Sequence, residues 1–140
     1  MTKLITWCKI LFAEVGTILL YYIGGMDKLI YTLIAFVSVD YITGVISAVM
    51  HKELDSRVGY KGIFHKIIIF ALVGIANLLD KNILNSQELL RTAVILYYIA
   101  NEGVSIMENA GEIGIPIPQK LLDVLAQLKG EQEDGSTDER

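Results

Sequence analysis

The chain has 140 residues, of which 53% are hydrophobic and 20% are charged, and its formal net charge is −4. The length fits a single domain, and a mean hydropathy of +0.48 favours a small integral membrane protein over a compact soluble domain. The basic residues are not interleaved with aromatics as in a nucleic-acid surface, and the single cysteine, Cys8, excludes an internal disulfide.

Four apolar segments follow one another along the chain. They cover about residues 10–25, 29–50, 63–79 and 89–107, and both prolines lie beyond the fourth. A segment in lipid must satisfy its own backbone hydrogen bonds, so each segment is predicted to be helical. The sequence therefore predicts an all-α integral membrane protein with three to four short transmembrane helices within residues 1–110.

Two interpretations fit the first segment. Its apolar length is compatible with a transmembrane span. Lys9 and Glu14 also give it a polar side, which is typical of a helix that lies on the membrane surface. Both alternatives stay open at this point, and the second segment crosses the membrane in the same direction in either case.

The second segment, residues 29–50, is the clearest span, because about 20 residues cross the hydrocarbon core. It carries one charge, Asp40, near its middle, where a carboxylate costs about 2.5–3.5 kcal/mol on insertion scales. Asp40 shares one helical stripe with Thr43 and Ser47. Such a stripe is expected to face a bundle interior or water.

Basic residues predict the orientation. The stretch "HKELDSRVGYKG", residues 51–62, is predicted to be a polar cytoplasmic loop that carries Lys52, Arg57 and Lys61, with Lys66 just beyond it. With this loop inside, most lysines and arginines lie in the cytoplasm, as the positive-inside rule requires. Before the fourth segment, Ser86 is predicted to cap the helix, with Glu88 in its first turn.

The C-terminal part changes character. The stretch "GIPIP" predicts an extended elbow, because each proline disfavours the helical conformation in the residue before it. Leu121, Leu125 and Leu128 then recur at helical spacing. Residues 111–129 are therefore predicted to form an elbow and a cytoplasmic amphipathic helix. Residues 130–140 are predicted to form a disordered acidic tail.

Polar residues recur on one side of each apolar segment, and two interpretations fit them. In the first, Asp40 and Glu102 pair with Lys66 or Arg91 inside one subunit and hold the bundle together. In the second, the polar stripes of several copies line a hydrated opening. The predicted pore-lining or intramembrane polar residues are Glu14, Asp40, Thr43, Ser47, Asn77, Asp80, Arg91, Glu102, Ser105 and Asn109. No catalytic or phosphate-binding motif is recognisable, so no enzyme activity, cofactor or metal is expected.

Several stretches resemble, in order and spacing, the toxin-secretion and phage-lysis holins of Gram-positive phages and clostridia. These stretches are "DYITGVISA", "SRVGYKGIFHK", "LLD" and "RTAVILYYIANEGVSIMENAGEIGIPIPQKLLDVLAQLK". The resemblance covers about residues 36–129 and is most specific over residues 101–118. His65 is a departure, since a second basic residue is expected beside Lys66.

The resemblance implies a phage or prophage protein of the bacterial cytoplasmic membrane. The apolar segments and the positive-inside rule predict that it crosses this membrane several times, with its C-terminus in the cytoplasm. The resemblance also implies a large homo-oligomer that opens lesions in the lipid bilayer, through which an endolysin or a toxin escapes without stable binding, and no nucleic-acid partner. The residues alone also leave open a small proton-coupled transporter, with Glu14 as the exchanging carboxylate, or a non-conducting membrane adaptor.

Overall fold

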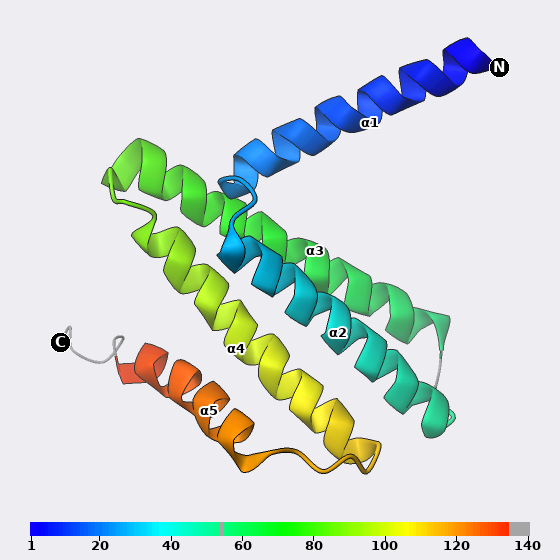
Figure 1. Cartoon of the computed structure of the whole chain (residues 1–140), viewed down its shortest axis with the longest axis vertical. Coiled ribbons are helices and arrows are strands. Elements are labelled where there is room, and N and C mark those ends of the chain that lie inside the picture. The colour runs from blue at the N-terminus through cyan, green and yellow to red at the C-terminus, as the bar shows by residue number, and fades with distance from the viewer. Residues whose placement is uncertain (54, 135–140) are drawn as a thin grey trace.

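The computed structural model describes residues 1–53 and 55–134, and within these residues every regular element is a helix (Figure 1). This confirms the all-helical prediction. The elements are α1 (Thr2–Ile23), α2 (Lys28–Met50), α3 (Ser56–Leu79), the π-helical turn η1 (Asp80–Leu84), α4 (Leu89–Glu112) and α5 (Gln119–Asp134).

Helices α2, α3 and α4 form a three-helix bundle (Figure 1). α2 and α4 run in the same direction and α3 runs in the opposite one, so that the start of α2 lies near the start of α4. The core between them is aliphatic, as expected where close packing supplies most of the helical stability. Its buried residues are Ile30, Leu33, Val37, Ile69, Val73, Ile95 and Ile99.

Helix α1 is an arm that leaves the bundle (Figure 1). None of its residues is buried. Only its C-terminal end is attached, where the Tyr22 hydroxyl donates a hydrogen bond to the Ala71 carbonyl at 2.7 Å and the Tyr22 ring covers Gly74. A side chain at Gly74 would collide with this ring, so the absence of a Cβ at this position is what allows α1 to contact α3.

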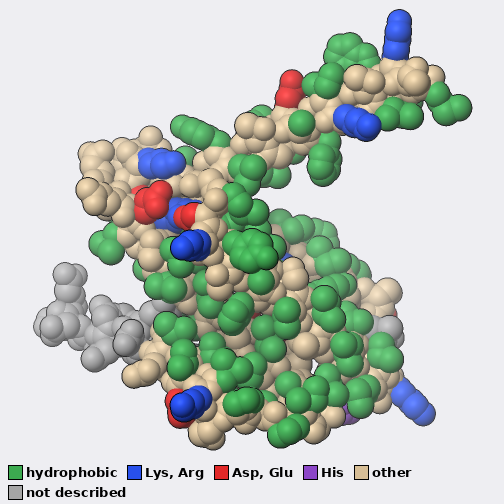
Figure 2. Space-filling model, in the orientation of Figure 1, with side chains coloured by type: hydrophobic (Ala, Val, Ile, Leu, Met, Phe, Trp, Pro, Cys, Tyr) green, Lys and Arg blue, Asp and Glu red, His purple; other side chains and the backbone are tan. Residues whose placement is uncertain are grey.

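Three helical stretches are long and apolar enough to cross a membrane: residues 2–23, 28–50 and 59–84. The 23 residues of α2 are about 35 Å long at 1.5 Å per residue, against a hydrocarbon core of about 30 Å. Figure 2 shows hydrophobic side chains along the arm and over the visible face of the bundle, with charged side chains mainly toward the ends. α4 is not among the three stretches, although it lies beside α2.

Several predicted boundaries need correction. α1 begins at Thr2, well before residue 10, and α4 continues to Glu112. α5 continues to Asp134, so the first residues of the predicted disordered tail are helical. Residues 135–140 of that tail lie outside the described residues.

The predicted polar loop is shorter than expected. α3 begins at Ser56, because Asp55 caps it by accepting a hydrogen bond from the Arg57 backbone N–H at 3.3 Å. Arg57, Lys61 and Lys66 therefore lie on a helix and not in a loop, while Lys52 precedes it.

Candidate functional site

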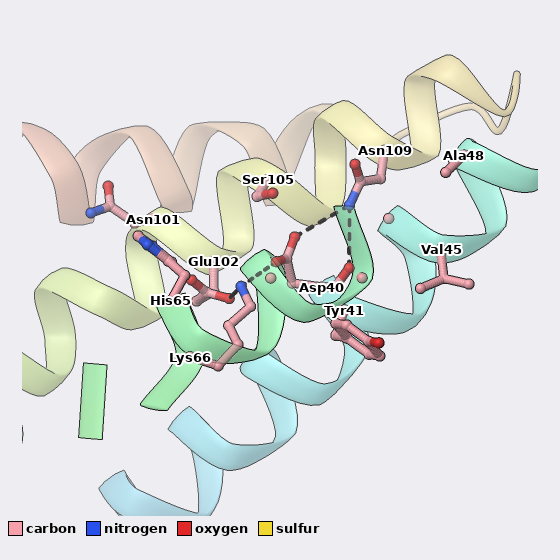
Figure 3. A pocket seen from close by; sticks show the side chains of 13 residues that line it. Asp40, Tyr41, Val45, Ala48, His65, Lys66, Asn101, Glu102, Ser105 and Asn109 are labelled. Atoms are coloured by element: carbon pink, nitrogen blue, oxygen red, sulfur yellow. Dashed lines mark hydrogen bonds and ion pairs between the residues drawn. The ribbon is translucent and has the colours of Figure 1, made fainter. Parts of the chain in front are cut away.

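The first polar cluster joins the three helices of the bundle. Lys66 of α3 donates hydrogen bonds to Asp40 of α2 and to Glu102 of α4, and we call these three residues the charged triad (Figure 3). Asp40 is 8% exposed and Glu102 is 4% exposed. Lys66, which the sequence predicts to belong to a cytoplasmic basic stretch, is thus the interior partner of two acids.

Neighbouring polar groups complete the hydrogen bonding along α2 and α4. The Asn109 amide donates to Asp40 Oδ1 at 3.2 Å and to Thr43 Oγ1 at 3.0 Å. Further toward the helix ends, the Ser47 hydroxyl donates to the Glu112 carboxylate at 2.5 Å. The predicted stripe of α2 therefore faces the polar side of α4, which is where intramembrane polar groups are normally satisfied.

A pocket of about 550 Å³ lies against the charged triad. Ser105 and Asn109 line it from α4, and Gly59 and Gly62 line it from α3. The pocket is polar on the triad side. Its volume corresponds to on the order of 20 water molecules at about 30 Å³ each, so it can hold water but not a macromolecule.

The second polar cluster is centred on Arg91, whose side chain is fully buried. Its Nη1 lies 2.6 Å from Asp27 Oδ2 and 3.6 Å from a Glu88 oxygen, and its Nε donates to the Ile23 carbonyl at 2.7 Å. Arg91 therefore fastens the turn between α1 and α2 to the start of α4. We call this group the arginine cluster.

Asp80 caps α4 from the end of α3. Its carboxylate accepts hydrogen bonds from the backbone N–H groups of Leu90, at 3.1 Å, and Arg91, at 2.7 Å. The prediction that Ser86 caps this helix is wrong, because the Ser86 hydroxyl donates to Asp80. A carboxylate is the stronger acceptor at a helix N-terminus, where unpaired N–H groups and the helix dipole favour negative charge.

The arginine cluster holds Asp27 in its ionised form. Burial by itself raises the pKa of Asp27, but the hydrogen bonds from Arg91 and from the Ile30 N–H outweigh it and leave the pKa below the ordinary 3.8. Because this pKa is lower in the folded state, the stability that Asp27 contributes is fully present above about pH 3.8 and is lost as the pH falls through the lowered value.

Gly24 and Gly25 provide a matched test of this turn. Both have positive φ, at 90° and 91°, but a Cβ on Gly24 would lie 2.6 Å from Arg91 Nε and Asn77 Oδ1, whereas a Cβ on Gly25 would meet nothing within 4 Å. We expect Gly25→Ala to cost about 1–2 kcal/mol of unfolding free energy from the backbone alone. Gly24→Ala should cost about 1–3 kcal/mol more because it crowds the arginine cluster. Denaturation of the detergent-solubilised variants measures both, and equal losses would contradict the close contact.

The remaining predicted residues are distributed as follows. Asn77 is buried beside the turn, where its amide donates to the Tyr22 carbonyl at 2.9 Å. Glu14 lies exposed near the middle of α1. Lys52, Arg57 and Lys61 are exposed and form no ion pair with another described residue.

The structure favours one of the two interpretations for part of the predicted set. Asp40, Glu102 and Lys66 pair within a single subunit, and so do Arg91 and Asp27. Whether any of the predicted residues lines an opening stays a prediction. The sequence missed Asp27 and Glu112 as partners. Asp27 carried one available signal, because an Asp directly before an apolar helical run is a common N-cap, and it does cap α2.

A bundle that encloses charged side chains and presents apolar residues outward is the architecture of a helical membrane protein. Comparison with known proteins identifies the protein family. The model of the bacteriophage holin family matches residues 17–130. The chain belongs to this family, and together with the three membrane-capable helices this membership indicates a multi-pass membrane protein.

Individual relatives agree with this assignment. The chain is 37% identical over 132 residues to the "Uncharacterized 14.9 kDa protein in nagH 3'region" of Clostridium perfringens, which covers 94% of this chain and 100% of the relative. It is 38% identical over 112 residues to the "Probable holin" of Bacillus phage phi105, covering 80% of this chain and 82% of that protein. No solved structure matches the chain.

Proposed function

We propose that this protein is a phage or prophage holin that oligomerises in the bacterial cytoplasmic membrane and opens lesions through which an endolysin, or a toxin, leaves the cytoplasm. The observation that carries the proposal is the family match over residues 17–130, together with a relative named "Probable holin". The three membrane-capable helices supply the membrane location that this function needs.

Lesions of this kind require several copies. The pocket beside the charged triad, at about 550 Å³, is far too small for a folded enzyme, and the core of the bundle is closed by aliphatic side chains. An opening that passes a protein therefore has to form between subunits, with their polar surfaces toward water and their apolar surfaces toward lipid.

The basic residues and the helix directions support one orientation. Lys52, Arg57 and Lys61 lie between the end of α2 and the first turns of α3, and the positive-inside rule places that end in the cytoplasm. Because α4 runs parallel to α2, its C-terminal end and the elbow before α5 belong on the same side.

Expression in a bacterium tests the proposal. We expect induction to stop growth abruptly and to collapse the membrane potential, and a co-expressed cytoplasmic endolysin should then lyse the cells. Purified protein in vesicles should release a dextran of protein size. The control is an unrelated multi-pass protein present at the same amount in the membrane.

The same measurements separate the other functions. A proton-coupled transporter would show saturable uptake of a small cation and would retain the dextran. A membrane adaptor would change neither potential nor permeability. An unchanged membrane potential at high membrane expression would therefore exclude the holin function.

A further inference from the structure

Helix α5 folds back along α4 instead of extending away from the bundle (Figure 1). Leu125 of α5 is buried in this contact, with 4% of its surface exposed. A Cβ built on Gly103 would lie 2.6 Å from Leu125 Cδ2 and 3.2 Å from Phe36 Cε1, so Leu125 occupies the space above Gly103, beside Phe36. Because Gly103 in the middle of α4 has no side chain, Leu125 of α5 can pack directly against α4.

This contact sets the depth of α5. Phe36 lies about 12 Å from the start of α2, at 1.5 Å per residue, in a helix that is long and apolar enough to span the bilayer. Gly103 lies one residue after Glu102, which reaches the charged triad. Leu125 is thus at the level of the middle of the span and not at the membrane surface.

The outer face of α5 is polar. At 100° per residue, Lys120, Asp123 and Gln127 all lie within about 40° of the direction opposite Leu125. All three are exposed, and within the described residues they contact no other helix through a hydrogen bond or ion pair, since the Gln119 amide that donates to Asp123 belongs to α5 itself. We call these three residues the outer row of α5.

A charged row at this depth is incompatible with lipid. Lysine and aspartate at the centre of a bilayer each cost about 2.5–3.5 kcal/mol on insertion scales. Among the described residues, neither has an ion-pair partner outside α5 to offset the cost. The outer faces of α2 and α3 differ, because apolar residues such as Ile42 and Ile68 are exposed there. The subunit therefore has a side that suits lipid and a side that suits water.

We propose that the outer row of α5 lines the water-filled opening between copies of this protein. The proposal rests on the holin function and assigns the lumen-facing surface within it. It replaces the expectation that this helix lies in the cytoplasm. It also gives the charged triad a separate task, because the triad holds the bundle together while α5 faces the lumen.

Cysteine accessibility tests the proposal in the full-length chain. Cys8→Ser provides a cysteine-free background, into which Asp123→Cys or Gln127→Cys is introduced. The matched control is Ile42→Cys, which is exposed on α2 at a similar depth but on the apolar surface. A membrane-impermeant thiol reagent is added outside intact cells before and after the potential collapses.

We expect Asp123→Cys and Gln127→Cys to react several-fold faster after the collapse than before it, and Ile42→Cys to stay unreactive throughout. The use of two lumen positions keeps the test informative if one variant does not insert. Labelling of both positions from the cytoplasmic side of inverted vesicles before any collapse would place α5 in the cytoplasm and overturn the proposal. Protection of both after the collapse would overturn it as well and would point to a protein–protein contact over the outer row. If the Cys8→Ser protein and the wild type never collapse the potential, the holin function itself fails and the lumen assignment falls with it.

Discussion

Replacing Lys66 with methionine is expected to lower the free energy of unfolding by about 3–5 kcal/mol, the usual effect of removing one partner from a buried ion pair. The reason is that Asp40 and Glu102 then face each other without a cation in a site where both are buried. Methionine preserves most of the length and apolar surface of the lysine side chain, so packing changes little. Denaturation of the purified protein in detergent, followed by circular dichroism, measures the loss.

Two controls isolate the charge effect. Lys61→Met removes an exposed cation from the same helix and should change stability by less than about 0.5 kcal/mol. The triple variant Asp40→Asn, Lys66→Met, Glu102→Gln removes the charged triad as a whole and should recover most of the loss, because a fully neutral interior is often as stable as a buried ion pair. If Lys66→Met is as mild as Lys61→Met, the triad does not hold the three helices together.

The second large effect is expected for Arg91→Met, which should cost about 1–3 kcal/mol, less than a fully buried pair because the Asp27 side chain is 41% exposed. Arg91 is fully buried, and its loss leaves the Ile23 carbonyl and the Asp27 carboxylate without their main donor. The physical consequence is local, because these are the groups that attach the α1–α2 turn to α4. We therefore expect the α1 arm to become mobile while α2, α3 and α4 stay assembled.

The natural cysteine allows the mobility of the α1 arm to be measured without a further substitution. A spin label on Cys8, which is exposed on α1, should show clearly faster motion in Arg91→Met than in the wild type. Arg57→Met, which removes an exposed arginine, is the control and should leave the label unchanged. The wild type should also lose stability as the pH falls below about 3.8 and Asp27 is protonated. This part of the pH dependence should be smaller in Arg91→Met, where the Ile30 N–H still lowers the pKa of Asp27 but Arg91 no longer does. Identical label motion in all three proteins would contradict the role of the arginine cluster.

The sequence predicted the helices better than it predicted their partners. The length of the hydrophobic segment was enough to predict the bounds of α2 almost to the residue. The uncharged runs on either side of Asp40 are stable in lipid only as a helix. The start of α3 was missed because polarity suggested a loop, whereas a single cap at Asp55 extends the helix through the basic residues. Composition does not distinguish a polar loop from a polar first turn of a helix.

The members of the candidate site were predicted, and the pairing of Asp40 and Glu102 with Lys66 was predicted as one of two alternatives. Asp40, Lys66, Glu102 and Arg91 were all singled out, yet periodicity assigns a residue to a side of its own helix and says nothing about which helix faces it. Asp80 shows the limit most clearly. Its role depends on a backbone that returns ten residues later to place two N–H groups on one carboxylate, and this return depends on the π-helical turn. No local sequence pattern predicts such a turn.

The parallel course of α2 and α4 has an electrostatic consequence. Two helices that point the same way bring their N-terminal poles together, and each pole behaves as about half a positive charge. Asp27 begins α2 and Asp80 caps α4, so each acid lies on one of these poles. The excess of acids around Arg91 is therefore partly balanced by the peptide backbone, whose two aligned macrodipoles would repel each other at this end without the carboxylates.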